Sequence, residues 1–438
     1  MTNPNREDLE RELDGLVADD VAGGSFKVHR KVYVDREIFE LEKERVFNRS
    51  WLYVAHESEI PRPGDFRTRI AAGRSLIVAR GDDGAIRVLL NHCSHRGTLL
   101  CREAAGTAKH FRCPYHAWTY DTSGRLTAVP SPEAYGPEFD KKSWGLKSTP
   151  RFENYRGFIF VAFDPTIEPF TESLRDAKEY LDLVCDMSET GLEVLPGSHR
   201  YSMRANWKLL VENGVDNYHF AILHNRYIQH LRDNGVDIGP RGEQCDVSVG
   251  KSLGNGHGVS EHQQLASFGR LAGHWGTLLP AWTKDTLDAL RANLDARVGK
   301  ERAFRIAQTN RNVRFFPNLY VLDHISPVIR LITPRAVDFI DVQEWVLAPK
   351  GESPEIRALR MRNNFLQVGP AGFVSSDDVE VLDLTQRGLE HPEMEWVDSS
   401  RGMKLGRHLS SDEQQMRGLH RHWHELMTLG RVRHPEDV

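Results

Sequence analysis

Residues 91–120 read NHCSHRGTLLCREAAGTAKHFRCPYHAWTY and contain two short pairs of metal-ligand side chains. The first pair is Cys93-Ser-His95, and the second, further along the same stretch, is Cys113-Pro-Tyr-His116. Thiolate and imidazole groups are the ligands that zinc and some iron–sulfur clusters use in proteins. Because each pair adjoins a short apolar run typical of a strand, the spacing predicts two loops that face one metal centre.

Two kinds of metal centre fit these four ligands: a structural zinc site and a Rieske [2Fe–2S] cluster. A zinc finger pairs Cys with Cys and His with His, whereas here each pair holds one Cys and one His. The single residue between Cys93 and His95 is also tighter than the usual zinc spacing. In a Rieske cluster two Cys bind one iron and two His bind the other. The pattern therefore favours the Rieske cluster.

The composition excludes several other classes of protein. The 438 residues are 39% hydrophobic and 27% charged, which predicts two or three folded domains rather than disorder. Lys and Arg number 57 against 62 Asp and Glu, so we expect neither nucleic acid nor a membrane surface as partner. The start of the chain lacks the apolar centre of a secretory signal, and five cysteines do not suit a disulfide framework. We therefore expect a cytoplasmic protein.

A second cluster of ligand-type residues occurs in residues 206–224, NWKLLVENGVDNYHFAILH. On a helix, Asp216 and His219 share a face because they are three residues apart. His219 and His224 point about 140° apart on an ideal helix. Both can bind one metal only where the helix ends or widens. The pair taken alone is a weak signal.

A third ligand is available in residues 368–383, VGPAGFVSSDDVEVLD. We expect it to be Asp378, with Asp377 as the alternative. Two His and one carboxylate on one face of Fe(II) leave positions open for water, O2 or substrate. Without the two His, the acidic pair reads as an ordinary solvated helix start.

Together and in this order, the two clusters resemble the large (alpha) subunit of Rieske non-haem iron aromatic-ring-hydroxylating dioxygenases. The resemblance covers nearly the whole chain. It extends to the GPAGF segment at Gly369–Phe373, and it rests on the following motif residues: Cys93, His95, Cys113, His116, Glu212, Asn213, Asp216, Tyr218, His219, His224 and Asp378.

The resemblance implies an α+β fold in two domains. An antiparallel-β Rieske domain (49–165) precedes a catalytic domain (166–438) with a large antiparallel sheet flanked by helices, of the helix-grip or START-like kind. Residues 1–48 form a helical part that packs with the catalytic domain.

The resemblance also implies the cofactors, the partners and the reaction. Electrons from NADH pass through a separate reductase, often with a separate ferredoxin, to the [2Fe–2S] cluster and then to the mononuclear Fe(II). The iron uses O2 to cis-dihydroxylate an aromatic ring. A hexamer of three large and three small subunits is implied. Asp216 bridges His219 to His116 of a neighbouring subunit, and Asn213 lies near the iron without binding it tightly.

The substrate is the least determined feature. The segment MRANWKLLVEN, the SRGM motif at Ser400–Met403 and the run Phe373–Ser376 resemble the branch that acts on aromatic carboxylates, with p-cumate ranked first. Candidate partners for a carboxylate are Arg314, His324 and Arg330. Expected pocket walls are Val215, Phe220, Leu223, Phe316, Phe365 and Phe373.

Alternatives remain open at this point. A salicylate-type Rieske monooxygenase or hydroxylase, a demethylase, or a dioxygenase acting on polycyclic or other arenes would use the same metal ligands. A Rieske ferredoxin would leave the second cluster of residues unexplained, and a zinc hydrolase would contain no sulfide.

Periodicity predicts a helix over 36–47, helical segments over 172–184, 207–224 and 410–427, and a long loop over 249–276. Cys101, Cys185 and Cys245 have no partner spacing and are expected to be small buried residues.

Overall fold

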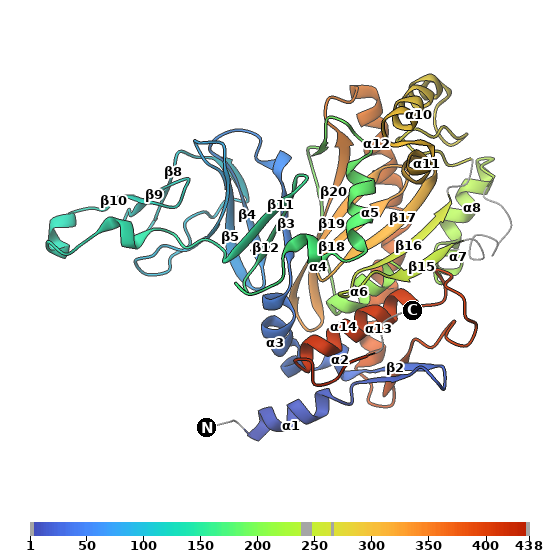
Figure 1. The fold of residues 1–438 in the computed structure, drawn as a ribbon, viewed down its shortest axis with the longest axis horizontal. Coiled ribbons are helices and arrows are strands. Elements are labelled where there is room, and N and C mark those ends of the chain that lie inside the picture. Colours follow the sequence, from blue (N-terminus) through green and yellow to red (C-terminus); the bar gives the residue numbers. More distant parts are fainter. Residues whose placement is uncertain (1–3, 238–247, 264–266, 435–438) are drawn as a thin grey trace. The chain divides into compact units, whose positions relative to one another are not determined.

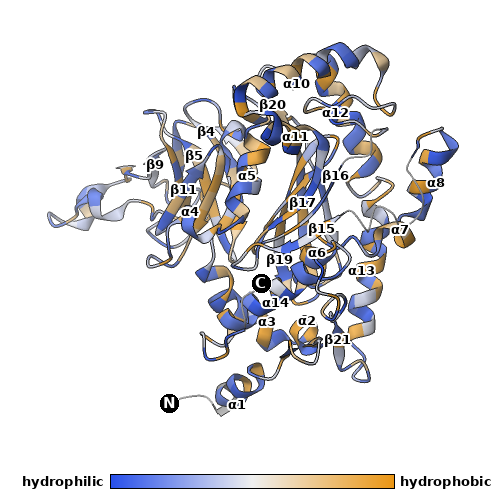
Figure 2. Cartoon of the chain, turned by 45° about the vertical axis from the view of Figure 1, so that its right-hand side comes forward, coloured by the Kyte–Doolittle hydropathy of each residue, from blue (hydrophilic) through white to orange (hydrophobic). Residues whose placement is uncertain are grey.

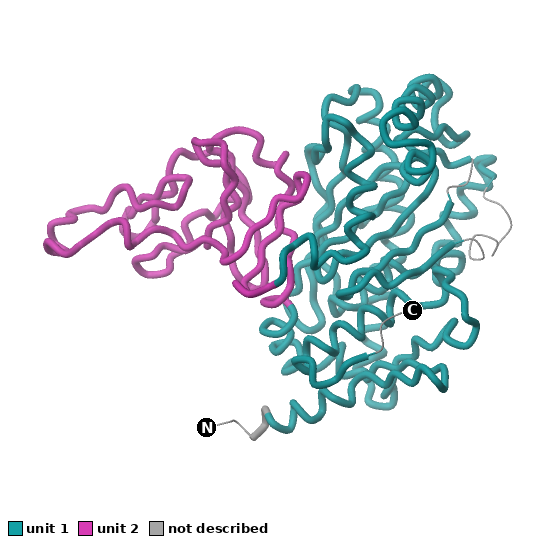
Figure 3. The backbone as a smooth tube through the Cα atoms, in the orientation of Figure 1, with its two compact units in different colours: residues 1–46, 168–438 teal, residues 47–167 magenta. Residues whose placement is uncertain are grey.

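The computed structural model describes residues 4–237, 248–263 and 267–434 (Figure 1). The chain divides into two compact units, residues 47–167 and residues 1–46 with 168–438 (Figure 3). The first 46 residues thus group with the C-terminal part of the chain, and the sequence-based boundaries lie within two residues of this division. We call these the small unit and the large unit.

The small unit is built from three antiparallel sheets in its described residues. In sheet order the strands are β6 (Ile86–Leu90), β5 (Arg74–Arg80), β4 (Asp65–Ala71) and β7 (Ala105–Thr107); β10 (Leu126–Ala128), β9 (Thr119–Asp121) and β8 (His110–Arg112); and β11 (Arg151–Tyr155), β12 (Phe158–Ala162) and β3 (Leu52–His56). The strands are short, and apolar residues bury at least one face of the longer strands β3, β4, β5 and β12.

The large unit contains one long antiparallel sheet, with β14 (His199–Met203) pairing to β20 beside the main path. Its central strands are rich in Val, Ile and aromatic residues, which suit a pleated buried surface. In order the other strands are β13 (Leu192–Val194), β20 (Phe339–Pro349), β19 (Pro327–Ala336), β18 (Leu319–Asp323), β17 (Thr309–Phe315), β16 (Gly258–Gln263) and β15 (Val249–Ser252).

Helices pack on both faces of this sheet. Successive residues of a strand point to opposite faces, and β17 shows where each face leads. Arg314 donates to the carbonyls of Val211 in α6 (Trp207–Asn213) and Gln415 in α14 (Gln414–Met427). Arg311 donates from the other face to Arg305 in α11 (Lys300–Gln308), which contacts α5 (Ala177–Cys185). The expected sheet flanked by helices is confirmed.

Hydrophobic and hydrophilic colours alternate along helices such as α10 (Figure 2). The described helices do not include one that is both long and apolar enough to cross a bilayer. The remaining elements are a small sheet of β1 (Val17–Asp20), β2 (Ser25–His29) and β21 (Trp396–Asp398), and the helices α1 (Pro4–Leu13), α2 (Lys31–Val34), α3 (Arg36–Arg45), α4 (Phe170–Ser173), α7 (Phe220–Leu223), α8 (Asn225–Asp233), α10 (Lys284–Val298), α12 (Pro354–Gln367) and α13 (Ser375–Leu389).

Several sequence-based elements need correction. The expected loop over 249–276 contains the hairpin of β15 and β16, because its Gly and Ser residues occupy strand positions packed under α14. The last helix begins at Gln414, four residues after the predicted start at residue 410, and no side chain caps it. Cys101 and Cys185 are buried as expected, whereas Cys245 lies outside the described residues.

A buried ion pair joins the N-terminal segment to the rest of the large unit. The side chains of Glu42 in α3 and Lys208 in α6 are both fully buried, 2.5 Å apart. The indole N–H groups of Trp207 and Trp423 donate to the same carboxylate at 2.8 and 2.7 Å. Because a buried charge is tolerated only when it is paired and hydrogen-bonded, this cluster fixes α3, α6 and α14 to one another.

Replacing Lys208 with Met should lower the free energy of unfolding by about 3–5 kcal/mol, since Glu42 would keep its charge without a cation. Urea unfolding followed by tryptophan fluorescence measures this, because Trp207 and Trp423 lie at the pair. Lys43→Met is the matched control, because its partner Glu40 is exposed and such a pair contributes at most about 1 kcal/mol. Equal losses in the two variants would contradict the role given to the buried pair.

Candidate functional site

Two loops of the small unit carry the first four ligand-type residues in the same local geometry. Each Cys donates its N–H to the carbonyl five residues on, at 2.8 Å for both Cys93 and Cys113. Each also accepts from the N–H four residues on, from Gly97 at 2.8 Å and Ala117 at 3.0 Å. Gly97 and Ala117 have φ of 73° and 57°, the left-handed values that a tight reversal requires. The sequence pairs therefore form two equivalent loops.

The two loops bring their side chains to one place. Cys93 and Cys113 are 2% and 3% exposed, belong to the same buried cluster and are not in a disulfide. The rings of His95 and His116 lie nearer the surface with centroids 4.7 Å apart. The buried Nδ1 of His95 has no hydrogen-bond partner among the described residues. Two buried thiols, two imidazoles and an unpartnered ring nitrogen fit the ligand set of a [2Fe–2S] cluster of the Rieske type.

In the large unit the helix expected over 207–224 is interrupted. Helix α6 ends at Asn213, and the Asp216 carboxylate accepts the N–H of Tyr218 at 2.7 Å. Such a local side-chain bond competes with helix continuation. The chain becomes helical again at α7, which places His219 at the start of α7 and His224 between α7 and α8. The break lets two His that are five residues apart face the same point.

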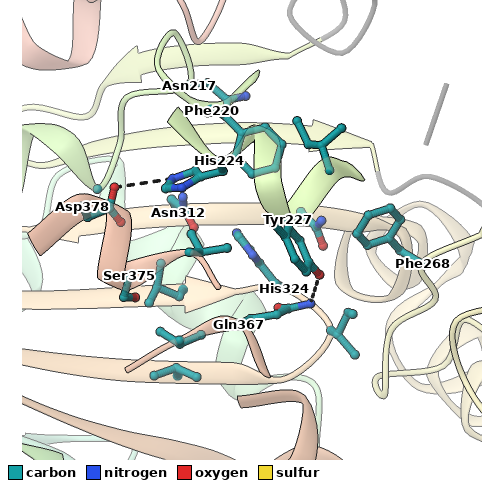
Figure 4. A pocket seen from close by; sticks show the side chains of 18 of the residues that line it. Asn217, Phe220, His224, Tyr227, Phe268, Asn312, His324, Gln367, Ser375 and Asp378 are labelled. Carbon is teal, nitrogen blue, oxygen red and sulfur yellow. Dashed lines mark hydrogen bonds and ion pairs between the residues drawn. The ribbon is translucent and has the colours of Figure 1, made fainter. Parts of the chain in front are cut away.

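That point is occupied by Asp378 at the start of α13. One ligand atom from each of His219, His224 and Asp378 lies within 4.8 Å of the others. The Nε2 atoms of His219 and His224 are 3.6 and 3.4 Å from Asp378 Oδ1. Asn213 donates to the same oxygen at 3.2 Å. Figure 4 shows His224 and Asp378 pointing toward each other at one side of a cavity.

The other nitrogen of each His meets a second carboxylate. His219 Nδ1 is 2.8 Å from Asp216, and His224 Nδ1 is 3.2 Å from Asp377. A carboxylate at Nδ1 holds the proton there and leaves Nε2 free to bind a metal. Burial lowers the pKa of His219, but the hydrogen bond and charge of Asp216 outweigh it, so the pKa lies above its usual value. Three carboxylates around two imidazoles suit a divalent cation.

A cavity of about 170 Å³ adjoins this triad. The triad and Asn213 form one part of its lining, and its apolar wall includes Phe220, Ile228, Leu231, Leu322 and Val328. An apolar cavity of roughly 150 Å³ is large enough to bind benzene. The cavity is therefore sized for one substituted aromatic ring.

The sequence placed the pocket walls poorly. Of the six expected wall residues, Phe220 lines the cavity. Val215 instead packs against Tyr320 in the core, and Phe373 stacks on His230 with ring centroids 4.8 Å apart. Because a single apolar residue carries no sign of which side it faces, these predictions were wrong. The expected residues that do not line the cavity formed by the described chain are Val215, Leu223, Phe316, Phe365 and Phe373.

Two of the three candidate carboxylate partners line the cavity. Arg330 does, but its charge is paired with Glu344 at 2.5 Å. His324 also does. Arg314 is not part of the cavity wall in the described chain, and its guanidinium donates to three backbone carbonyls, which is a structural role.

Sequence reasoning missed Asp377 as the partner of His224 and missed the polar residues His262, Asn310 and Asn312, which also line the cavity. Asn310 and Asn312 are two residues apart, and this alternation was the available signal, since alternate residues of a strand share a face.

Comparison with known proteins identifies both units. Residues 192–429 match the family described as "Ring hydroxylating alpha subunit (catalytic domain)", and residues 50–150 match "Rieske [2Fe-2S] domain". The chain belongs to the ring-hydroxylating alpha subunit family. It is 34% identical to the large subunit of anthranilate 1,2-dioxygenase from Acinetobacter baylyi over 92% of this chain and 86% of that relative.

Two further proteins are similar to this alpha subunit. It is 39% identical to the alpha subunit of N,N-dimethyl phenylurea N-demethylase from Sphingobium sp. over 80% of this chain and 78% of that protein. The solved structure of naphthalene 1,2-dioxygenase from Rhodococcus sp. bound to indole superposes with a TM-score of 0.83 at 27% identity, covering 98% of this chain and 100% of that one.

The chain is thus the large subunit of an aromatic-ring-hydroxylating dioxygenase. It is an oxidoreductase with a Rieske [2Fe–2S] cluster and a mononuclear iron, and O2 is its cosubstrate. The Rieske motif and the His–His–Asp geometry of this chain agree with that cofactor set.

Asp377→Ala should lower the affinity of the large unit for Fe(II) by about 10- to 100-fold, because His224 would lose the carboxylate that orients its ring. Titration of iron-depleted protein with Fe(II) or Co(II) measures the change. Glu380→Ala is the matched control, since Glu380 is an exposed acid on the same helix. An affinity equal to that of the control would show that Asp377 does not orient the ligand.

Proposed function

We propose that this alpha subunit cis-dihydroxylates a single-ring aromatic carboxylate. The cavity beside the His–His–Asp triad carries this proposal, because its volume of about 170 Å³ suits one ring rather than a fused polycycle. Anthranilate, the substrate in the name of the Acinetobacter relative, is such a carboxylate. Among the compounds of this class, p-cumate is the first to test.

The ligand roles follow from the donor sets. Cys93 and Cys113 would bind one iron of the cluster, and His95 and His116 the other. The mononuclear iron would be held as a facial triad by the following residues: His219, His224 and Asp378. Bound iron supplies O2 activation, and the cluster supplies single electrons.

The residues around the triad position the ligands and exclude water. Asp216 and Asp377 hold the two imidazoles in the tautomer that presents Nε2. Asn213 donates to Asp378 and so fixes the orientation of the carboxylate. Phe220 and its apolar neighbours exclude water from the part of the cavity that would hold the aromatic ring of the substrate. Exclusion of water prevents side reactions of reactive species.

The proposed assembly is a hexamer of three large and three small subunits, supplied by an NADH-dependent reductase and a ferredoxin in the cytoplasm, where NADH is available. Asp216 is the proposed bridge between His219 and His116 of a neighbouring subunit. Its Oδ2 contacts His219, and the carboxylate is partly exposed, so a second imidazole can reach it.

The substrate proposal is tested by turnover of the reconstituted enzyme with benzoate, p-cumate and anthranilate, against naphthalene. We expect the carboxylates to give cis-dihydrodiols, or a catechol where the diol carries a leaving group. Their turnover rates should be at least tenfold above the rate with naphthalene. Preference for naphthalene would contradict the proposal.

A second reaction has its own support, the 39% identity to an N-demethylase. Adding N,N-dimethyl phenylurea to the same panel tests it. Loss of a methyl group as formaldehyde, with no diol from any carboxylate, would replace the proposed function with demethylation.

Asp216→Asn should retain both metal centres and lose most of the coupled turnover, at least tenfold, because a neutral amide is a poor bridge between two imidazoles. Iron content, acid-labile sulfide and product formation measure the outcome. Asp233→Asn, at the exposed end of α8, is the matched control. Near-normal turnover in Asp216→Asn would rule out the proposed electron route.

A further inference from the structure

One wall of the cavity is made of polar residues on the large sheet. The strand register places His262 opposite Asn310 and Asn312 opposite Leu322. Asn310 and Asn312 are two residues apart on β17, so they share a face. The next residue of this wall is His324, just past the end of β18. Its ring is 6.5 Å from that of His262.

A chain of hydrogen bonds fixes which nitrogen of His262 carries the proton. Arg270 donates to Asn310 Oδ1 at 3.1 Å, which leaves the amide Nδ2 of Asn310 as a donor. That Nδ2 lies 3.3 Å from His262 Nε2, so Nε2 must accept. The proton of the neutral imidazole is then on Nδ1. His262 Nδ1 is buried and has no partner among the described residues, so it presents an unused N–H donor.

The imidazoles of His262 and His324 are both neutral. Burial lowers the pKa of His262 to about 4, and the positive charge of Arg270 acts in the same direction. Burial also lowers the pKa of His324 to about 3, assisted by His262 and Arg270. Both rings are therefore neutral at neutral pH, and each imidazole has one N–H that can donate to a ligand.

Other polar atoms of residues that line the cavity also have no partner among the described residues. The buried atoms without a partner among the described residues include His324 Nε2, Ser326 Oγ, Asn312 Oδ1 and Asn363 Nδ2. A buried polar atom left unpaired is destabilising, so several of them around one cavity indicate a place where a polar group of a ligand binds. Figure 4 shows His324 between His224, which lies beside Asp378, and Phe268 at the other side of the view.

We propose that His262 is the specificity-determining residue that recognises the substrate carboxylate. The carboxylate accepts the Nδ1–H of His262 and lies beside the unpartnered Nε2 of His324. The carboxylate then occupies the polar wall while the ring lies against Phe220 and Leu322, toward the triad. Arg270 and Asn310 are positioning residues, since they act by holding the tautomer of His262. This inference rests on the proposed function, because it assigns the group that recognises the same substrate.

Equilibrium binding of benzoate and toluene to the intact enzyme tests the inference. The two ligands have a similar shape, but benzoate carries a carboxylate where toluene carries a methyl group. A hydrogen bond to a charged group is typically equivalent to about a 10- to 100-fold change in affinity. His262→Leu should therefore weaken benzoate by this factor and leave toluene within about threefold. His262→Asn places an amide N–H near the position of Nδ1 and should recover most of the benzoate affinity.

His274→Leu is the matched control, because His274 also lies near Arg270 but its Nδ1 is bonded to Gln308 at 3.3 Å, away from the cavity. We expect it to bind both ligands as the wild type does. Equal weakening of benzoate and toluene in His262→Leu, or no weakening of either, would overturn the inference, and so would an Asn variant no better than Leu.

The binding result is separable from the proposed function. If the wild type forms products from carboxylates but His262→Leu binds benzoate normally, the inference fails alone. If the wild type neither binds nor converts any aromatic carboxylate, both fail together.

Discussion

The structure depends on the pairing of each catalytic imidazole with a carboxylate on its far side. Asp216 and Asp377 hold the Nδ1 protons of His219 and His224, and the two Nε2 atoms consequently face Asp378. Without these partners a buried imidazole can rotate or change tautomer, and a metal would lose a ligand. Three carboxylates around two imidazoles suit a cation bound between His219, His224 and Asp378.

The fold serves this arrangement. The break after Asn213 gives His219 and His224 a common direction, and the large sheet supplies a wall on which α6 and α13 rest. The N-terminal segment contributes through Glu42, whose buried pair with Lys208 fixes the helix that carries Asn213. Glu42, which is far from the metal ligands in sequence, thereby helps to position Asn213 beside Asp378.

Much of the site could be predicted from the sequence because metal ligands combine rare residue types with fixed spacing. Cys93, His95, Cys113 and His116 show this, and Asp378 could be chosen because two His need a carboxylate to complete a triad.

Pocket walls could not be predicted in the same way. Phe365 and Phe373 read like wall residues, yet which side they face depends on how α12 and α13 pack. The hairpin of β15 and β16 was missed because its Gly-rich sequence has weak strand propensity, and packing under α14 overrides it. The polar wall around His262 became visible only when the strand register placed His262 beside Asn310.

The central claim is that this chain adds both atoms of one O2 molecule to the ring of an aromatic carboxylate. Turnover of the reconstituted enzyme with benzoate under 18O2, with mass spectrometry of the product, tests it most directly. The account predicts a cis-diol in which both hydroxyl oxygens are 18O. A product with one 18O and no diol would contradict it.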